Sequence, residues 1–551
     1  MLHATPIQHL HLQVPALDVS LIRADDLRTA FAAAMSQMYK NEVPRYGDLV
    51  RIVQEVNQAA LSGISSWGAG VSHATTDSPE CLSLERHGAI RLGLPNELRT
   101  VRRIFAVLGM YPVGYYDLSV AGLPMHATCF RPMTPASLAR NPFRVFTTLL
   151  RPDLVKSEDG TRELALQLLS RRTLFSPELL SVLDRAERQE QGLYAEQAEI
   201  FIREALQTFS WANGVAASTA DEYARLSAEH PVLADIACFR TAHINHLTPR
   251  ALDIDAAQRA MVGEGMSVKE RIEGPPRRRF PILLRQTSFL AIHEPVHFLA
   301  EQDSTGGLDE RKMMREDSST NQRLVKGSHC ARFGEIEERG AAVTVAGRRL
   351  YDNLLAETTA QVASHETNAN SRTYDKVLTE TFRGKYPDDL GELCRQRLIF
   401  CQYRCTGKQL TNSWPEIAVS RGKESSLGGL GDAIDANVEV MLDWAHCLVD
   451  EGVLVAEPIT YEDFLPFSAA GIFQSNLQRT GSASTETTSK QSSAKSGPAR
   501  IPSLVEARGG DKDSLEEALG VAITDPDVLY AQAQKDSLLG CLKELGLNDT
   551  L

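Results

Sequence analysis

Two stretches of the chain share one layout, and this repeat restricts the fold more than any other feature. In each, a histidine in a strand-like segment (His87 or His243) stands 22 residues before the glycine of a Gly-Met pair. The residues between predict a helix that ends at that glycine, and a second strand-like run follows. The layout indicates a β-α-β unit used twice, with chance as the alternative.

The rest of the chain predicts an α+β protein. Strand-like segments are expected at 85–93, 111–119, 125–132, 242–250, 281–290 and 329–345. Helices are expected at 24–40, 48–62, 95–109, 348–365 and 434–449, and a helical insertion at about 136–230. The alternating and helical periods of apolar residues carry these assignments.

The remaining segments are polar or irregular. Residues 1–23 predict a loose arm before a core of 24–477, and 301–326 predict a polar surface insertion in that core. The Ser/Thr-rich stretch 478–500 cannot bury enough apolar surface to fold and is expected to be disordered. The tail, 501–551, predicts short amphipathic helices that dock weakly or not at all.

Composition excludes several classes of protein. The 551 residues carry a net charge of −13, which disfavours a nucleic-acid binder because phosphate affinity comes from clustered Lys and Arg. No apolar run approaches the roughly 20 residues that span a bilayer, so we expect no membrane segment. The nine scattered cysteines and an N-terminus without a signal-peptide pattern indicate a reduced, cytoplasmic protein. Oligomeric state is left open.

The repeat also predicts where candidate metal ligands lie. A histidine at the start of the first strand in each half would bring His87 and His243 close to a pseudo-twofold axis. The stretch FGEIEERG offers a carboxylate, and alternation puts Glu335 and Glu337 on one face. Two histidines and one carboxylate with open positions suit non-haem Fe(II). The alternative is that the histidines are ordinary core or surface residues.

Further polar residues lie near this set. Alternation puts Arg91 on the face of His87, where a guanidinium could hold a substrate carboxylate bidentately or form a structural salt bridge. His246 either donates a hydrogen bond close to the metal site or has a purely structural role, and His329 is an alternative metal ligand.

Several long motifs resemble one family, the 2-oxoadipate dioxygenase/decarboxylases or hydroxyglutarate synthases. The likeness runs in order from about residue 24 to 477. The motifs are RHGAIR (86–91), GMYPVGYYDLS (109–119), HATCFRP (126–132), NPFRVFTTLL (141–150), HINHLTPRALDID (243–255), EGPPRRRFPILLRQTSF (273–289), RFGEIEERG (332–340) and YEDFLPFSAAGIFQSNL (461–477).

The resemblance implies a fold and a site. The fold is related to the vicinal-oxygen-chelate superfamily, a mixed β-sheet or half-barrel built from repeated βαβββ modules with a large helical insertion. The implied Fe(II) ligands are His87, His243 and Glu335, with Glu337 still possible. Arg91 would grip a substrate carboxylate. The pocket would be lined by Phe467 and Ser468, and family members often have Val in place of Phe467.

The implied reaction converts 2-oxoadipate and O₂ to 2-hydroxyglutarate and CO₂ in lysine breakdown. The substrate supplies its own electrons, so no separate 2-oxoglutarate is needed. The same scaffold also supports isomerases, lyases and ring-cleaving dioxygenases, because fold does not determine reaction. A third hypothesis is a non-catalytic, metal-stabilised scaffold whose tail recruits a partner.

Overall fold

The computed structural model describes most of the chain, and the statements below concern those residues. They are 21–62, 79–155, 159–189, 192–300, 313–316, 323–365, 371–408, 438–465 and 511–547. The predicted linker, 478–500, and most of the predicted arm lie outside this part of the chain.

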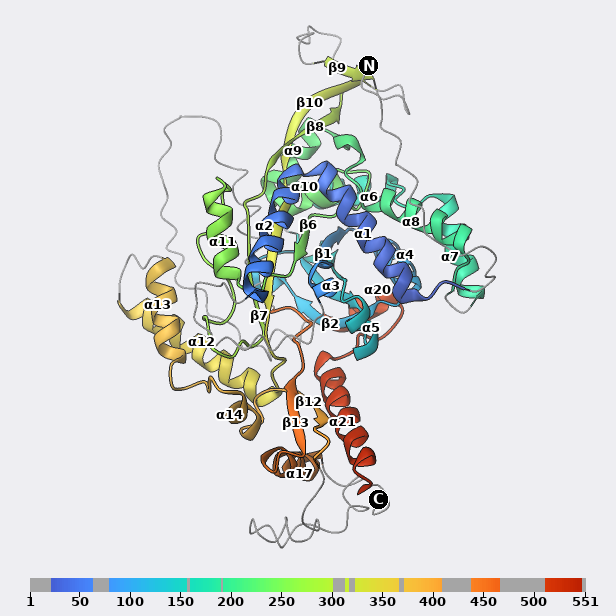
Figure 1. Ribbon diagram of the computed structural model, residues 1–551. Helices are drawn as coiled ribbons and strands as arrows, with labels where there is room; N and C mark the ends of the chain where they lie inside the picture. Colours follow the sequence, from blue (N-terminus) through green and yellow to red (C-terminus); the bar gives the residue numbers. More distant parts are fainter. Residues whose placement is uncertain are drawn as a thin grey trace.

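A seven-stranded mixed sheet forms the centre of the molecule (Figure 1). Its strand order is β2-β3-β4-β1-β6-β11-β7. The strands are β1 (Glu85–Leu92), β2 (Tyr111–Asp117), β3 (Met125–Arg131), β4 (Arg144–Leu150), β6 (His246–Pro249), β7 (Leu284–Ser288) and β11 (Phe333–Arg339). Helices surround the sheet, so the predicted α+β class is confirmed.

The sheet consists of two similar halves that meet between β1 and β6. In the first half β1 leads through α4 (Pro95–Val107) to β2 and β3, and β4 returns parallel to β1. In the second half β6 leads through α11 (Ile254–Gly263), and β11 returns parallel to β6 with β7 antiparallel beside it. The predicted repeat is therefore present, as a βαβββ module in the first half and with one strand fewer in the central sheet in the second half.

The register between the two halves identifies a different counterpart of His87 from the one that the repeat spacing predicted. β1 and β6 are antiparallel, and Gly88 pairs with Leu247. A twofold axis through that pair relates His87 to His246, not to His243. β6 begins only at His246, so His243 precedes the strand in which it was predicted to lie.

Helix length explains why the 22-residue spacing pointed to His243 and not to His246, the counterpart of His87 in the repeat. His87 and His246 each stand eight residues before the helix that follows. However, α4 has 13 residues and α11 only 10, so the Gly-Met pair comes three residues earlier in the second half. The two pairs themselves are equivalent, because Gly109 and Gly265 both end their helices at positive φ.

The predicted helical stretch 136–230 is partly wrong. Its residues Arg144–Leu150 form β4, which lies between β3 and β1 in the sheet. All seven residues are buried, because apolar layers cover both faces of the sheet, and the sequence therefore shows no clean alternation. The short helix α5 (Pro135–Arg140) precedes β4, and the other helices follow it: α6 (Thr161–Arg171), α7 (Pro177–Arg188), α8 (Ala195–Phe209), α9 (Ala220–Glu229) and α10 (Pro231–Ala237).

A second sheet, of order β5-β8-β10-β9, lies beside the first. Its strands are β5 (Val215–Thr219), β8 (His293–Leu299), β9 (Met313–Glu316) and β10 (Arg323–Cys330). The predicted surface insertion 301–326 thus contains β9 and the start of β10. One face of the central sheet packs against α4, α8, α11, α1 (Ala24–Glu42) and α2 (Pro44–Leu61).

The C-terminal tail is docked, contrary to the prediction. α20 (Lys512–Leu519) packs on α4, and Thr524 hydrogen-bonds to the edge of β2. The tail's α21 (Pro526–Glu544) covers the two-stranded sheet of β12 (Cys401–Cys405) and β13 (Leu454–Pro458). There the Gln534 and Ser537 side chains accept hydrogen bonds from β12 main-chain N–H groups. These bonds satisfy an open sheet edge.

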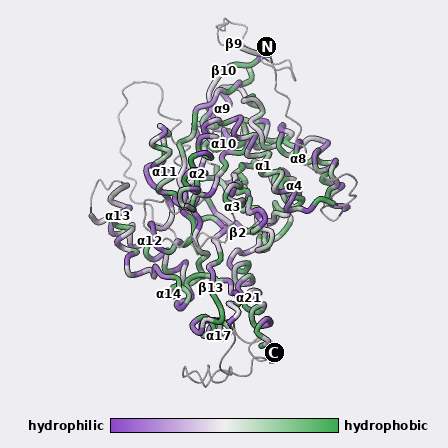
Figure 2. Tube along the Cα trace, in the orientation of Figure 1, coloured by the Kyte–Doolittle hydropathy of each residue, from purple (hydrophilic) through white to green (hydrophobic). Residues whose placement is uncertain are grey.

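Hydropathy agrees with this arrangement, since β13 is mainly hydrophobic where it lies beside α17 (Val438–Asp450) (Figure 2). The helices α12 (Val345–His365), α13 (Ser371–Phe382) and α14 (Leu390–Arg395) form a separate group at one side of the molecule (Figure 1). Among the described helices, none combines the length and apolar composition that crossing a lipid bilayer requires.

Candidate metal and substrate site

Three buried side chains converge from neighbouring strands of the central sheet. His87 comes from β1, His246 from β6 and Glu335 from β11, and each offers a ligand atom within 4.8 Å of the others. Each side chain is at most 3% exposed. In the strand order β1-β6-β11, Ala89 of β1 and Phe333 of β11 both pair with His246, so their side chains share one face of the sheet. His87 and Glu335 each stand two residues from these positions and therefore lie on the same face. We refer to these three residues as the first cluster.

The geometry around His87 separates the two candidate glutamates. Glu335 Oε1 lies 2.9 Å from His87 Nε2, on the side of His246. Glu337 Oε2 lies 2.7 Å from the other ring nitrogen, Nδ1. Arg339 binds both oxygens of Glu337, at 2.8 and 2.7 Å. Glu335 therefore faces the ligand position, and Glu337 orients the ring from behind.

Glu337 remains ionised in this position. Burial alone would raise the pKa of its carboxyl group, but Arg339 and His87 hold that pKa well below the ordinary value. An ionised carboxylate on Nδ1 fixes the imidazole tautomer that presents Nε2 to a metal. This carboxylate–histidine arrangement is typical of metal sites in proteins.

The donor set of the first cluster fits a divalent transition metal. It consists of two imidazoles and one carboxylate, the set that binds non-haem Fe(II) with open positions. Although Glu335 Oε1 is close to His87, its geometry leaves it without a hydrogen bond from any described residue. A buried carboxylate oxygen without a donor is costly, and a cation at the centre of the cluster would satisfy it.

A second buried cluster has the same composition. Asp235 of α10, His243 and His329 of β10 also offer ligand atoms within 4.8 Å of one another. Asp235 Oδ1 lies 2.8 Å from His329 Nε2 and 3.2 Å from His243 Nε2. The prediction that His243 shares an ion with His87 is thus not what the geometry favours, because His243 belongs to this second cluster.

Arg91 belongs to the second cluster as well. Its guanidinium donates to Asp235 Oδ2, and both side chains are almost completely buried. Alternation along β1 still places Arg91 on the same face as His87, as predicted. The two predicted pocket residues, Phe467 and Ser468, lie outside the described residues.

Comparison with known proteins agrees with the motifs. The family model for 2-oxoadipate dioxygenase/decarboxylase matches residues 31–476. The chain belongs to the 2-oxoadipate dioxygenase/decarboxylase family. The family predicted from the sequence motifs is thus confirmed. The chain is an enzyme of this family, because its similarity to a relative of that name extends over nearly the full length of both chains.

Relatives in this family match almost end to end. The 2-oxoadipate dioxygenase/decarboxylase of Pseudomonas putida is 41% identical over 534 residues, which cover 97% of this chain and 99% of the relative. The Escherichia coli protein of the same name is 41% identical over 522 residues, 94% of this chain and 98% of the relative. A crystal structure of the Pseudomonas putida hydroxyglutarate synthase in complex with 2-oxoadipate superposes with a TM-score of 0.73. It is 39% identical and covers 96% of this chain and 99% of its own.

One aromatic residue near the first cluster was not predicted from the sequence. The ring of Phe464 meets the His87 ring edge-on, with centroids 4.9 Å apart. Two tyrosines hold its backbone, because Tyr116 accepts from the Phe464 N–H and Tyr461 donates to the Phe464 carbonyl. The family motif YEDFLPF contains Phe464, but nothing local in that motif indicates contact with a strand nearly 400 residues earlier.

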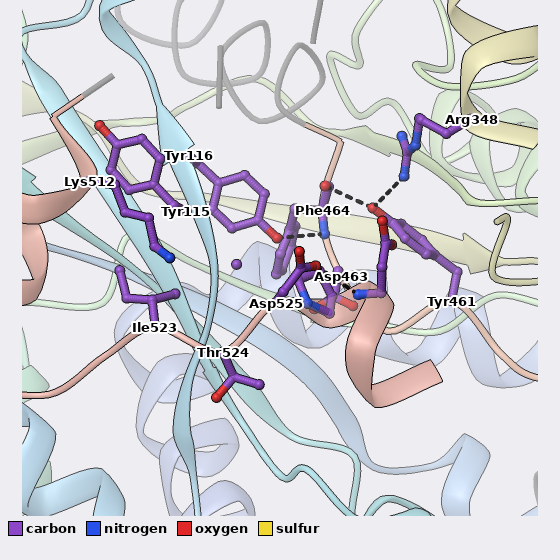
Figure 3. Close-up of a pocket in the computed structure, with 13 residues that line it drawn as sticks. Tyr115, Tyr116, Arg348, Tyr461, Asp463, Phe464, Lys512, Ile523, Thr524 and Asp525 are labelled. Carbon is purple, nitrogen blue, oxygen red and sulfur yellow. Dashed lines mark hydrogen bonds between the residues drawn. The ribbon is translucent and has the colours of Figure 1, made fainter. Parts of the chain in front are cut away.

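Phe464 also lines a cavity of about 220 Å³ (Figure 3). Tyr116, Asp463 and Arg348 line other parts of it, and Arg348 hydrogen-bonds to the Tyr461 hydroxyl. Another part of the wall comes from the tail, at residues 512 and 523–527. The docked tail therefore takes part in shaping the surroundings of the site.

Proposed function

We propose that this enzyme uses Fe(II) to convert 2-oxoadipate and O₂ to 2-hydroxyglutarate and CO₂, as a step of lysine breakdown. The observation that carries the proposal is the first cluster, a two-histidine, one-carboxylate set in a family named for this substrate. The relative from Pseudomonas putida in complex with 2-oxoadipate supports the choice of substrate.

In this proposal His87, His246 and Glu335 hold the metal. His246 replaces His243, the second ligand that the repeat spacing had suggested. When bound, Fe(II) would supply a Lewis acid and a redox centre at which a 2-oxo acid and O₂ can meet. Three protein ligands leave positions open for both.

The surrounding residues have separate tasks. Glu337, held by Arg339, keeps the His87 ring in the orientation and tautomer that a ligand needs. Phe464 covers one edge of that ring with an apolar surface, which excludes water. Arg91 binds a substrate carboxylate and positions the carbon chain. By family resemblance Phe467 and Ser468 line the pocket.

The test is turnover of 2-oxoadipate by the iron-loaded enzyme. We expect O₂ uptake, CO₂ release and 2-hydroxyglutarate, identified by mass spectrometry, in equal amounts. Arg91→Met should raise KM by at least about tenfold, because a charge-assisted hydrogen-bond pair is lost. Turnover that persists without O₂ would contradict the oxygenase and favour an isomerase or lyase on the same scaffold.

A further inference from the structure

Two cysteine thiols lie against each other where the chain passes from α14 into β12. Cys394 stands near the end of α14, and Cys401 is the first residue of β12. Both are free thiols, and their sulfur atoms are 3.3 Å apart, within hydrogen-bond distance. The sulfur atoms of a disulfide are about 2.05 Å apart, so this pair would have to close by only about 1.2 Å to form one.

The two thiols differ in their access to solvent. Cys401 is buried, with 2% of its surface exposed, whereas Cys394 is only partly buried. A small oxidant can therefore reach Cys394, and Cys401 waits behind it. An accessible thiol in contact with a second one is the arrangement typical of redox-sensitive cysteines.

The hydrogen bond between the thiols also divides their reactivity. The Cys401 thiol donates to Cys394 and lowers the pKa of Cys394, against the effect of burial. The same hydrogen bond, together with burial, raises the pKa of Cys401 well above its ordinary value. Because the thiolate is the nucleophile, Cys394 is the thiol that attacks first and Cys401 the one that follows.

The other end of β12 offers a comparison within the same strand. Cys405 packs on Cys541 of α21, and its thiol donates to the Cys541 carbonyl at 3.7 Å. Burial raises the pKa of Cys405 to about 12, and it raises the pKa of Cys541 as well. Both of these thiols therefore stay protonated near neutral pH, and we expect them to react slowly.

The reactive pair lies where β12 anchors the C-terminal tail. The main-chain N–H of Cys401 donates to the Gln534 side chain of α21, at 2.8 Å. A covalent link from Cys394 to Cys401 would thus join α14 to the strand that holds the tail. Neither cysteine belongs to the first cluster, so this pair is separate from the candidate metal ligands.

We propose that Cys394 and Cys401 form a reversible redox site, in which a low-molecular-weight disulfide converts the two thiols into one intramolecular disulfide. The Cys394 thiolate attacks one sulfur of the oxidant, which forms a mixed disulfide and expels one thiolate. Cys401 then loses its proton and attacks the Cys394 sulfur, which expels the second thiolate. The protein gives up two electrons and two protons, and the oxidant leaves as two thiols.

The test is incubation of the folded, full-length enzyme with oxidised glutathione, followed by an acid quench and mass spectrometry without reductant. The intact mass should fall by two hydrogen atoms, and digestion should give peptides joined through Cys394 and Cys401. Dithiothreitol should restore the original mass. Absence of this link in the unaltered enzyme would overturn the inference, as would a link that dithiothreitol fails to reverse in the folded protein.

Two serine variants separate the roles of the thiols. Cys401→Ser lacks the second thiol, so it should accumulate a mixed disulfide, seen as the mass of one glutathione added at Cys394. Cys394→Ser lacks the attacking thiol, so Cys401 should gain neither a link nor a glutathione. Glutathione on Cys401 in Cys394→Ser, at the rate seen for Cys394 in the other variant, would contradict these roles. The measurement on the unaltered enzyme stands whether or not either variant folds.

Cys447→Ser is the matched control, because Cys447 is another partly buried cysteine and lies outside the pair, on α17. This variant should form the link between Cys394 and Cys401 in full. Loss of the link in Cys447→Ser would contradict the assignment. A link between Cys405 and Cys541 that forms as fast as the proposed one would also overturn it, because proximity alone would then explain the reaction.

Discussion

The two buried clusters contain the same residue types but differ in what surrounds them. In the first, His87, His246 and Glu335 face one another, and the neighbouring carboxylate of Glu337 is held by Arg339. In the second, Arg91 binds directly to Asp235, the carboxylate of the cluster itself. The comparison teaches that the same three residue types can stand in different electrostatic surroundings. In the first cluster the nearest guanidinium binds a neighbouring carboxylate, and in the second it binds the carboxylate of the cluster.

The chain between them explains how the clusters come to be neighbours. His243 and His246 are three residues apart, an odd number, so the extended backbone directs them to different surroundings. His246 lies in β6 beside β1, whereas His243 precedes the strand and points toward α10 and β10. A single short segment therefore supplies a histidine to each cluster.

The largest expected effect is on metal content. His246→Ala should lose bound iron and activity, by more than the roughly 10–100-fold cost of removing a residue that only hydrogen-bonds to a metal ligand. His243→Ala should keep stoichiometric iron, measured by elemental analysis after iron loading and desalting. Iron loss in His243→Ala with retention in His246→Ala would reverse the assignment of the clusters.

A smaller effect should follow from the support of His87. Glu337→Gln keeps the side-chain shape but weakens the contact to Nδ1, so iron affinity should fall by about 10–100-fold. Competition with a chelator measures this affinity. Glu338→Gln is the control, because Glu338 accepts hydrogen bonds from Ile254 and Arg285 instead. Equal losses in both variants would mean that any nearby charge matters, and not the specific contact.

The docked tail gives a prediction on stability. Tyr530 donates to Asp463 and accepts from the Glu462 N–H, so Tyr530→Phe leaves two buried polar groups short of a partner. The free energy of unfolding should fall by about 1–3 kcal/mol, measured by urea denaturation. Tyr194→Phe, at an exposed tyrosine, should change it little. An unaltered unfolding curve for Tyr530→Phe would contradict tight docking.

The smallest effect concerns acid stability without iron. Burial alone would raise the native pKa of Glu337, but Arg339 and His87 hold that pKa well below its ordinary value of 4.5. Its contribution is complete above the ordinary pKa and is lost as pH falls toward the native one. Between pH 5 and 3 the urea midpoint should therefore fall less steeply in Glu337→Gln. Parallel slopes in both proteins would contradict this.

Much of the fold was predictable because its evidence is local. Neighbouring residues alone carry the apolar periods that predict β1, α4, β2 and β3, and they include the glycines that end the helices. β4 was missed because a strand buried on both faces lacks alternation. The tail was misjudged because its hydrogen bonds to β12 and β2 involve residues more than 100 positions away.

By itself the sequence determined the α+β class, the repeat, the family, and the candidacy of His87 and of Glu335 or Glu337 as ligands. Alternation and motif order are properties of the chain alone, so these could be read directly. Only the tertiary structure decided that His246 joins them, that Glu337 supports His87, and that Arg91 meets Asp235. Those outcomes depend on strand order, register and a three-residue difference in helix length. These properties place side chains in space but cannot be predicted from the local pattern of apolar and polar residues.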